Sequence, residues 1–148
     1  MKISTKVEFG IIALADIAIY QKNGKTVSSA DISGRQGISQ KYLEQILVSL
    51  RQAGLIRGHK GSKGGYVLTH PASAISFSDI LNALDNSILS DTYLSEEEPA
   101  NGLRACVHSC VLDKLNKILT RFTADMTLES FIECYNSLQN EANVMYYI

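Results

Sequence analysis

Cysteine is scarce in this 148-residue sequence, which contains three cysteines and no uninterrupted apolar run approaching eighteen residues. A small, odd number of cysteines argues against the disulfide framework of a small secreted domain. The missing apolar run excludes an ordinary membrane-spanning helix. The basic start is followed by a stretch that Glu8 and Asp16 interrupt, without a small-residue cleavage site. We therefore expect no signal peptide, no membrane partner and a cytoplasmic location.

Motifs that carry enzyme chemistry are also missing. The sequence contains no phosphate-binding G-x-x-x-x-G-K-[ST] loop, no nucleophile motif G-x-S-x-G and no metalloprotease motif H-E-x-x-H. We therefore expect no enzyme activity. A hydrophobic fraction of 45% and a charged fraction of 20% are typical of a globular protein. The length suits one modest domain with an appended arm.

The two halves of the chain carry opposite charge. Residues 1–70 hold ten Lys and Arg against four Asp and Glu, a net charge of +6. Residues 71–148 hold four against eleven, a net charge of −7. This asymmetry favours a polyanion-binding module joined to a region with another role. A chance distribution of solvated surface charge is the alternative interpretation.

Apolar spacing and capping residues predict three helices in the first half. Residues 3–20 carry apolar side chains at helical spacing. Ser28 then starts a short helix that ends near Gly37, and Ser39 starts another over residues 40–53. The positions of this last helix that we assign to the core are Leu43, Ile46, Leu47 and Leu50.

The periodicity then changes from that of a helix to that of a hairpin. Residues 55–57 and 66–68 predict two short strands, and the tip between them is rich in glycine and carries Lys60 and Lys63. Glycine allows close backbone approach, and cations favour a narrow minor groove. The predicted fold is therefore mainly α with a small β-hairpin wing, a winged helix-turn-helix.

The remainder predicts a helix over residues 75–84, an acidic loop over 90–103, a long helix from Cys106, and a short helix over 128–135 capped by Thr127. The predicted organisation is a winged helix-turn-helix DNA-binding domain at 1–85, an acidic hinge at 86–105, and a dimerisation helix with a C-terminal tail at 106–148.

The second helix of a helix-turn-helix enters the major groove, and its first turn points at the bases. Glu44 is unusual beside phosphates unless it accepts a hydrogen bond from a cytosine amino group. A solvated Glu44 is the alternative, and for the whole module the rival interpretation is a winged helix that binds protein without DNA. The polar side chains at the start of this helix are Ser39, Gln40, Lys41, Tyr42, Glu44 and Gln45.

Together these segments resemble the Rrf2 family of bacterial regulators, which includes iron-sulfur cluster regulators, nitric-oxide-responsive repressors and cysteine-metabolism repressors. The resemblance is close over about residues 1–85 and looser along the long helix. It rests on residues 1–6, 30–33, 35–39, 41–45, 50–51, 53–55, 61, 64–66 and 79–80.

The resemblance implies a homodimer on double-stranded DNA, at an imperfect palindrome with half-sites about one DNA turn apart. It also implies that Glu44 and Gln45 reach bases and that Lys60, where relatives often carry Arg, enters the minor groove. Glu8 replaces a cation common in relatives, which weakens the case for a phosphate contact there. The expected DNA contacts are Thr5, Lys6, Ser28, Ser39, Gln40, Lys41, Tyr42, Glu44, Gln45, Arg51, Lys60, Ser62 and Lys63. The expected dimerisation contacts are Leu112, Leu115, Ile118, Leu119, Phe122 and Met126.

Cluster-binding relatives carry three cysteines close together before the long helix. Here Cys110 lies where the last would fall, Cys106 is four residues earlier and Cys134 is far away, so the three-thiolate site is broken. Three interpretations stay open. The cysteines are ordinary residues without a cofactor, or Cys106 and Cys110 form a redox pair, which a helix would strain. The third is an iron-sulfur or zinc site that uses Cys106, His108 and Cys110.

The broken cluster site and the tail at residues 145–148 make the resemblance closest to the cysteine-metabolism repressors. It implies a repressor of cysteine or sulfur metabolism with cysteine synthase as a partner. An apolar Ile148 with a free carboxylate, after two aromatics, suits a concave anion-binding pocket. Packing of the tail on the dimer core is the alternative.

Overall fold

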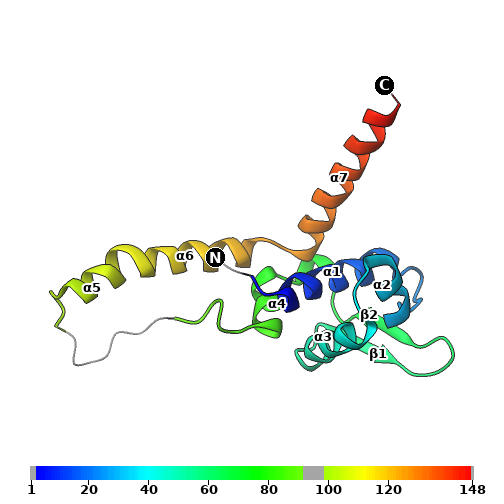
Figure 1. The fold of residues 1–148 in the computed structure, drawn as a ribbon, viewed down its shortest axis with the longest axis horizontal. Helices are drawn as coiled ribbons and strands as arrows, with labels where there is room; N and C mark the ends of the chain where they lie inside the picture. The colour runs from blue at the N-terminus through cyan, green and yellow to red at the C-terminus, as the bar shows by residue number, and fades with distance from the viewer. Residues whose placement is uncertain (1–2, 92–98, 148) are drawn as a thin grey trace.

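A computed structural model of the chain describes residues 3–91 and 99–147. Helices dominate these residues, with one two-stranded antiparallel sheet among them, as the predicted fold class requires. Figure 1 shows a body built from α1 to α4 and the sheet, a helical arm that extends from it, and α7, which leads away in another direction. No helix in the described ranges is long and apolar enough to cross a membrane.

Three helices of the body, α1 (Thr5–Tyr20), α2 (Ser29–Gln36) and α3 (Gln40–Gln52), begin after serine residues. Each serine hydroxyl accepts a hydrogen bond from the backbone N–H three residues on, which satisfies a donor that the helix leaves free. Gly37 ends α2 in the left-handed region at φ 66°, a conformation that glycine adopts without steric cost. The three N-caps are Ser4, Ser28 and Ser39.

The wing consists of β1 (Ile56–His59) and β2 (Gly65–Leu68), paired antiparallel with Ile56 opposite Leu68. The segment before α2 holds the wing in place. The Val27 and Tyr66 backbones exchange two hydrogen bonds, of 2.9 and 2.8 Å, and the Thr26 hydroxyl donates to the Lys63 carbonyl at 2.7 Å. The wing is therefore attached to the segment that leads into α2 at two places, in β2 and near the wing tip.

The core of the body lies where α1, α3 and α4 (Phe77–Leu84) meet the sheet. A Cβ atom on Gly10 would collide with the Leu84 side chain, so glycine allows α1 and α4 to approach closely. A short 3-10 turn (Ala72–Ala74) precedes α4, which a capping box of Ser76 and Asp79 begins. The predicted core face of α3 is fully buried, as expected for Leu43, Ile46, Leu47 and Leu50.

The arm contains α5 (Leu103–Val107), a π-helical turn (His108–Leu112) and α6 (Asp113–Asp125). The predicted start of the long helix at Cys106 is therefore wrong by most of a turn. The preceding Gly102 is extended and provides the boundary, because its backbone leaves the helical region.

The predicted length of the last helix is also wrong. Helix α7 (Leu128–Tyr146) continues far beyond Tyr135, because the sequence after Gly102 contains no glycine or proline that would stop it. The break between α6 and α7 falls at Met126, which is extended, and the predicted cap Thr127 does start α7.

The base of α7 belongs to the core of the body. Leu128 is fully buried, and its N–H donates to the Ile75 carbonyl at 2.9 Å. The rings of Phe77 and Phe131 meet edge to face with centroids 6.0 Å apart. The remaining length of α7 projects away from the body (Figure 1).

Candidate nucleic-acid interface

The first turns of α3 present polar side chains to solvent while its opposite face is buried. Gln40, Lys41, Glu44 and Gln45 are all exposed, and the Gln40 amide donates to the Glu44 carboxylate at 3.2 Å. Tyr42 is half-buried and meets Phe9 edge to face at 6.0 Å, so it anchors α3 to α1. The turn therefore offers amide, cation and carboxylate groups on a fixed helix.

A groove of about 360 Å³ lies between the start of α2, the end of α3 and the wing. Ser28, Arg51 and Lys60, which come from these three elements, all line it. Two cations beside a helix N-terminus form a favourable setting for an anion such as a phosphate. Three of the predicted DNA contacts thus come together although they are far apart in the sequence.

The wing tip requires glycine for its shape. Gly61 has φ of 114°, and a Cβ on Gly64 would lie 2.6 Å from the His59 carbonyl oxygen. The tight turn leaves the side chains of Lys60, Ser62 and Lys63 exposed. Ser62 and Lys63 line an adjoining groove together with Lys25, Thr26, Ser28 and Asp31.

Thr5 and Lys6 lie at the start of α1, and no described contact joins them to this groove. Lys6 is half-buried. Hydrogen bonds from Ser87 lower the pKa of Asp85, and the charge of Lys6 lowers it a little further.

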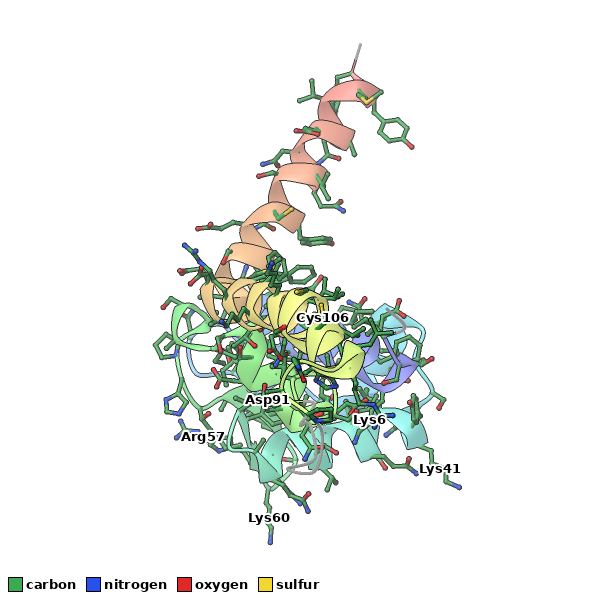
Figure 2. All side chains as sticks on the ribbon, turned by 90° about the vertical axis from the view of Figure 1, so that its left-hand side faces the viewer. Lys6, Lys41, Arg57, Lys60, Asp91 and Cys106 are labelled. Carbon is green, nitrogen blue, oxygen red and sulfur yellow. The ribbon has the colours of Figure 1, made fainter. Side chains whose placement is uncertain are left out.

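Arg57 is a candidate that the sequence reasoning missed. It is exposed on β1, next to the buried Ile56. In Figure 2, Arg57, Lys60 and Lys41 lie along the lower edge of the body, on the side opposite the rising helix α7. The alternation of a buried and an exposed residue in the first predicted strand was the available signal.

An ion pair between the buried Asp16 and the partly exposed Arg35 fixes α2 against α1. Asp16 is 2% exposed and accepts hydrogen bonds from Arg35 Nε at 3.0 Å, Arg35 Nη2 at 2.7 Å and Gln36 Nε2 at 2.8 Å. The hydrogen bonds to Asp16 raise the pKa of Arg35. The guanidinium also lies 3.9 Å from the centre of the Tyr20 ring. These contacts set the position of the helix that precedes α3.

The arm carries a stripe of apolar side chains that the body does not cover. Three predicted dimerisation residues, Leu115, Ile118 and Phe122, are 59–67% exposed, whereas the other three are half-buried. The stripe also extends beyond the prediction: Leu103 precedes the predicted start of the helix, whereas Val107 and Val111 lie inside the predicted helix but were not among the expected contacts. Its members, called the arm stripe below, are Leu103, Val107, Val111, Leu115, Ile118 and Phe122.

The cysteines do not form a three-ligand site. Cys106 and Cys110 are exposed neighbours on the arm with Sγ atoms 3.7 Å apart, whereas Cys134 lies on α7. A hydrogen bond with Cys110, and its charge, raise the pKa of Cys106. Within residues 3–91 and 99–147, no three His, Cys, Asp or Glu side chains gather closely enough to hold a metal ion. Cys106, His108 and Cys110 therefore do not converge in one chain.

The order of helices, the wing and the basic groove define a winged helix-turn-helix protein. Residues 3–134 match the Rrf2 family, described as iron-dependent transcriptional regulators. The chain is 46% identical over 89 residues to the HTH-type transcriptional regulator IscR of Cereibacter sphaeroides. That alignment spans 60% of this chain and 57%, little more than half, of the relative.

Two solved structures share the fold over most of the chain. CymR, the global cysteine regulator of B. subtilis, superimposes with a TM-score of 0.74 and 28% identity over 90% of this chain and 97% of its own. IscR of T. potens superimposes with a TM-score of 0.73 and 30% identity over 94% and 91%. The chain belongs to the Rrf2 family and is a DNA-binding transcriptional regulator, not an enzyme.

Proposed function

We propose that the protein acts as a homodimer on an imperfect palindrome in double-stranded DNA. The α3 helix of each protomer enters a major groove, and the two half-sites lie about one DNA turn apart. The observation that carries this proposal is that the start of α3 and the basic wing share one edge of the body, opposite the side from which α7 projects (Figure 2). A regulator of this class acts on the chromosome, so we assign it to the cytoplasm.

The proposed contacts divide into two kinds. Glu44 and Gln45 reach base edges, and the Gln40 amide that binds Glu44 at 3.2 Å would release it to a cytosine amino group. The groove formed by Ser28, Arg51 and Lys60 holds phosphate, and Lys60 extends into the minor groove. The first kind carries sequence preference and the second carries affinity.

Salt dependence separates these roles. Lys60→Ala should weaken binding to all sequences and lower the salt slope by about 0.9 for the lost phosphate contact. Glu44→Ala should instead cost about 1–3 kcal/mol of discrimination at one base pair. Fluorescence anisotropy across a salt series measures both effects. Lys117→Ala, which removes an exposed cation of α6, is the matched control. Equal slopes for Lys60→Ala and Lys117→Ala would contradict the proposed interface.

The arm stripe is the proposed dimer contact. Its leucine, isoleucine and phenylalanine side chains are more than half exposed in the single chain. Exposed apolar surface of this extent marks an interaction site, and twofold pairing of two arms buries the same stripe on both sides. The pairing would hold two α3 helices at a fixed separation.

We further propose that the protein represses genes of cysteine or sulfur metabolism and that cysteine synthase is a partner. The likeness to CymR supports the regulon, and the exposure of Tyr146 and Tyr147, at 90% and 92%, supports a role for the tail in docking. Ile148 lies outside the described residues. Deleting Tyr147 and Ile148 should weaken the binding of cysteine synthase, measured by calorimetry, and leave operator affinity unchanged. Unchanged enzyme affinity would rule out the tail as the anchor.

An iron-sulfur or zinc-dependent signal is the second candidate, favoured by the iron-dependent description of the family. The residues of one chain do not fit a three-thiolate cluster, because Cys134 is on another helix from Cys106 and Cys110. Purification without oxygen, followed by a visible spectrum and iron, sulfide and zinc analysis, tests this candidate. Stoichiometric metal would favour it, and a colourless, metal-free protein that binds DNA would favour the partner.

A further inference from the structure

Two exposed cysteines lie side by side on the outer part of the arm. Cys106 belongs to α5 and Cys110 to the π-helical turn that follows, and Figure 2 labels Cys106 on this helix. Their Sγ atoms are 3.7 Å apart, and the Ser109 hydroxyl lies 3.8 Å from Cys110 Sγ. π-Helical turns often mark functional positions in helices. The pair is thus accessible and correctly spaced for a ligand that uses both thiols.

The distance between the sulfurs selects a mode of binding. Two thiolates on one bent centre, at bonds of about 2.3 Å and an angle of roughly 90–110°, lie roughly 3.3–3.8 Å apart; this range covers a pyramidal centre as well as a tetrahedral one, whereas a linear centre would separate the sulfurs by roughly 4.6 Å. A disulfide requires about 2.05 Å and closely approaching Cβ atoms. The observed 3.7 Å matches bent chelation without movement of the helix.

The number of ligands narrows the chemical class. A tetrahedral metal ion needs four ligands, and the described part of the chain offers no third His, Cys, Asp or Glu at this place. His108 lies between the two cysteines in sequence, and residues two apart on a helix do not face the same side. Within one chain, the site therefore suits a thiophile that needs only two thiolates from the protein.

We propose that Cys106 and Cys110 form a dithiol site for a trivalent organic arsenical. An arsenical of the form R–As(OH)₂ exchanges its two hydroxyl groups for the two sulfurs. Two As–O bonds break, two As–S bonds form, and the thiol protons leave with the hydroxyl groups as two water molecules. The oxidation state of arsenic and sulfur does not change, so no oxidant is required.

The surroundings also suit the organic substituent. Leu103 and Val107 precede Cys106 and Cys110 by three residues, a spacing that brings helical side chains together. Both are exposed, Leu103 at 83% and Val107 at 45%. Both belong to the outer end of the arm stripe, where an apolar substituent such as phenyl would cover them in place of a second arm.

The test is a titration of the reduced, full-length protein with phenylarsenous acid, without DNA. We expect one adduct per chain by native mass spectrometry and protection of two of the three thiols from a chromogenic disulfide reagent. Cys106→Ser and Cys110→Ser should each weaken binding at least about 100-fold, because the second thiol then loses its high effective concentration. The exposed Cys134→Ser variant, the matched control, should bind as the wild type does.

Two further readouts address the geometry. Far-ultraviolet circular dichroism should keep its helical signal on binding, because the sulfurs already have the required spacing, and a tenfold excess of zinc should not displace the arsenical. Loss of helix, displacement by zinc, protection of one thiol, or equal affinity in Cys106→Ser and Cys134→Ser would overturn the proposal. Each result is obtained without DNA, so it is independent of the DNA-binding proposal.

Discussion

The body and the arm use the same residue types in opposite ways. In the body, leucine and isoleucine side chains of α3 are fully buried against α1 and α4. On the arm, Ile118 and Phe122 repeat at helical spacing but are 67% and 60% exposed. The difference teaches that the body supplies its own core, whereas the arm leaves apolar side chains exposed in the single chain, as the proposed dimer contact requires.

Ion pairs sharpen this comparison, and they give the largest expected effect. The Asp16 side chain is fully buried and lies 2.7 Å from Arg35. The Asp125 side chain is 74% exposed and lies 3.7 Å from Arg121. Asp16→Ala removes three hydrogen bonds but leaves an Arg35 side chain that is 32% exposed, so it should lower the free energy of unfolding by about 2–3 kcal/mol. Asp125→Ala should change it by less than about 0.5 kcal/mol. Urea unfolding at one protein concentration measures both, and equal losses would contradict the contrast.

The arm should respond through assembly instead of folding. Ile118→Glu places a charge in the proposed interface and should weaken dimerisation by about 2 kcal/mol, or roughly thirtyfold in Kd. Lys117→Glu introduces the same charge one residue earlier, outside the arm stripe, and should leave the dimer intact. Sedimentation velocity over a concentration series distinguishes the two. A monomeric Lys117→Glu variant, or an Ile118→Glu variant that dimerises as the wild type does, would contradict the proposal that the arm stripe forms the dimer contact.

The smallest effect concerns thiol reactivity. Because Cys110 raises the pKa of Cys106, less Cys106 is present as the reactive thiolate near pH 8. Cys110→Ser should lower that pKa and speed alkylation of Cys106 by iodoacetamide, while the rate at Cys134 stays the same. Peptide mass spectrometry over a time course gives both rates. A slower or unchanged rate at Cys106 would contradict the influence of Cys110.

Local signals predicted the body well. Serine caps and apolar spacing indicated the start of α2 and α3, and Leu43, Ile46, Leu47 and Leu50 were assigned to the core correctly. The hairpin followed from its glycines and strand residues. These features depend on neighbours in the sequence, so periodicity and capping chemistry were sufficient.

The missed features depend on distant contacts or on missing stop signals. Nothing near Asp16 shows that Arg35 will meet it, because the pairing needs α1 and α2 in place. The predicted end of α7 was too early, because the polar residues after Tyr135 give no clear apolar period, although no glycine or proline interrupts the helix there. The sequence shows that Cys106 and Cys110 are four residues apart, but the separation of their sulfurs depends on the local π-helical geometry, which the sequence did not predict. The DNA contacts themselves remain predictions.

The attachment of the wing has a consequence for signalling. The wing and the helix-turn-helix form one DNA-binding unit, because hydrogen bonds join Val27 to Tyr66 and Thr26 to Lys63. A signal that reaches the arm is therefore not expected to change the position of the wing relative to α3 within one chain. In the proposed homodimer, it would instead change the distance and the angle between the two DNA-binding units. Regulation would then depend on whether the separation of the two DNA-binding units, set by the paired arms, matches the spacing of the half-sites in the operator.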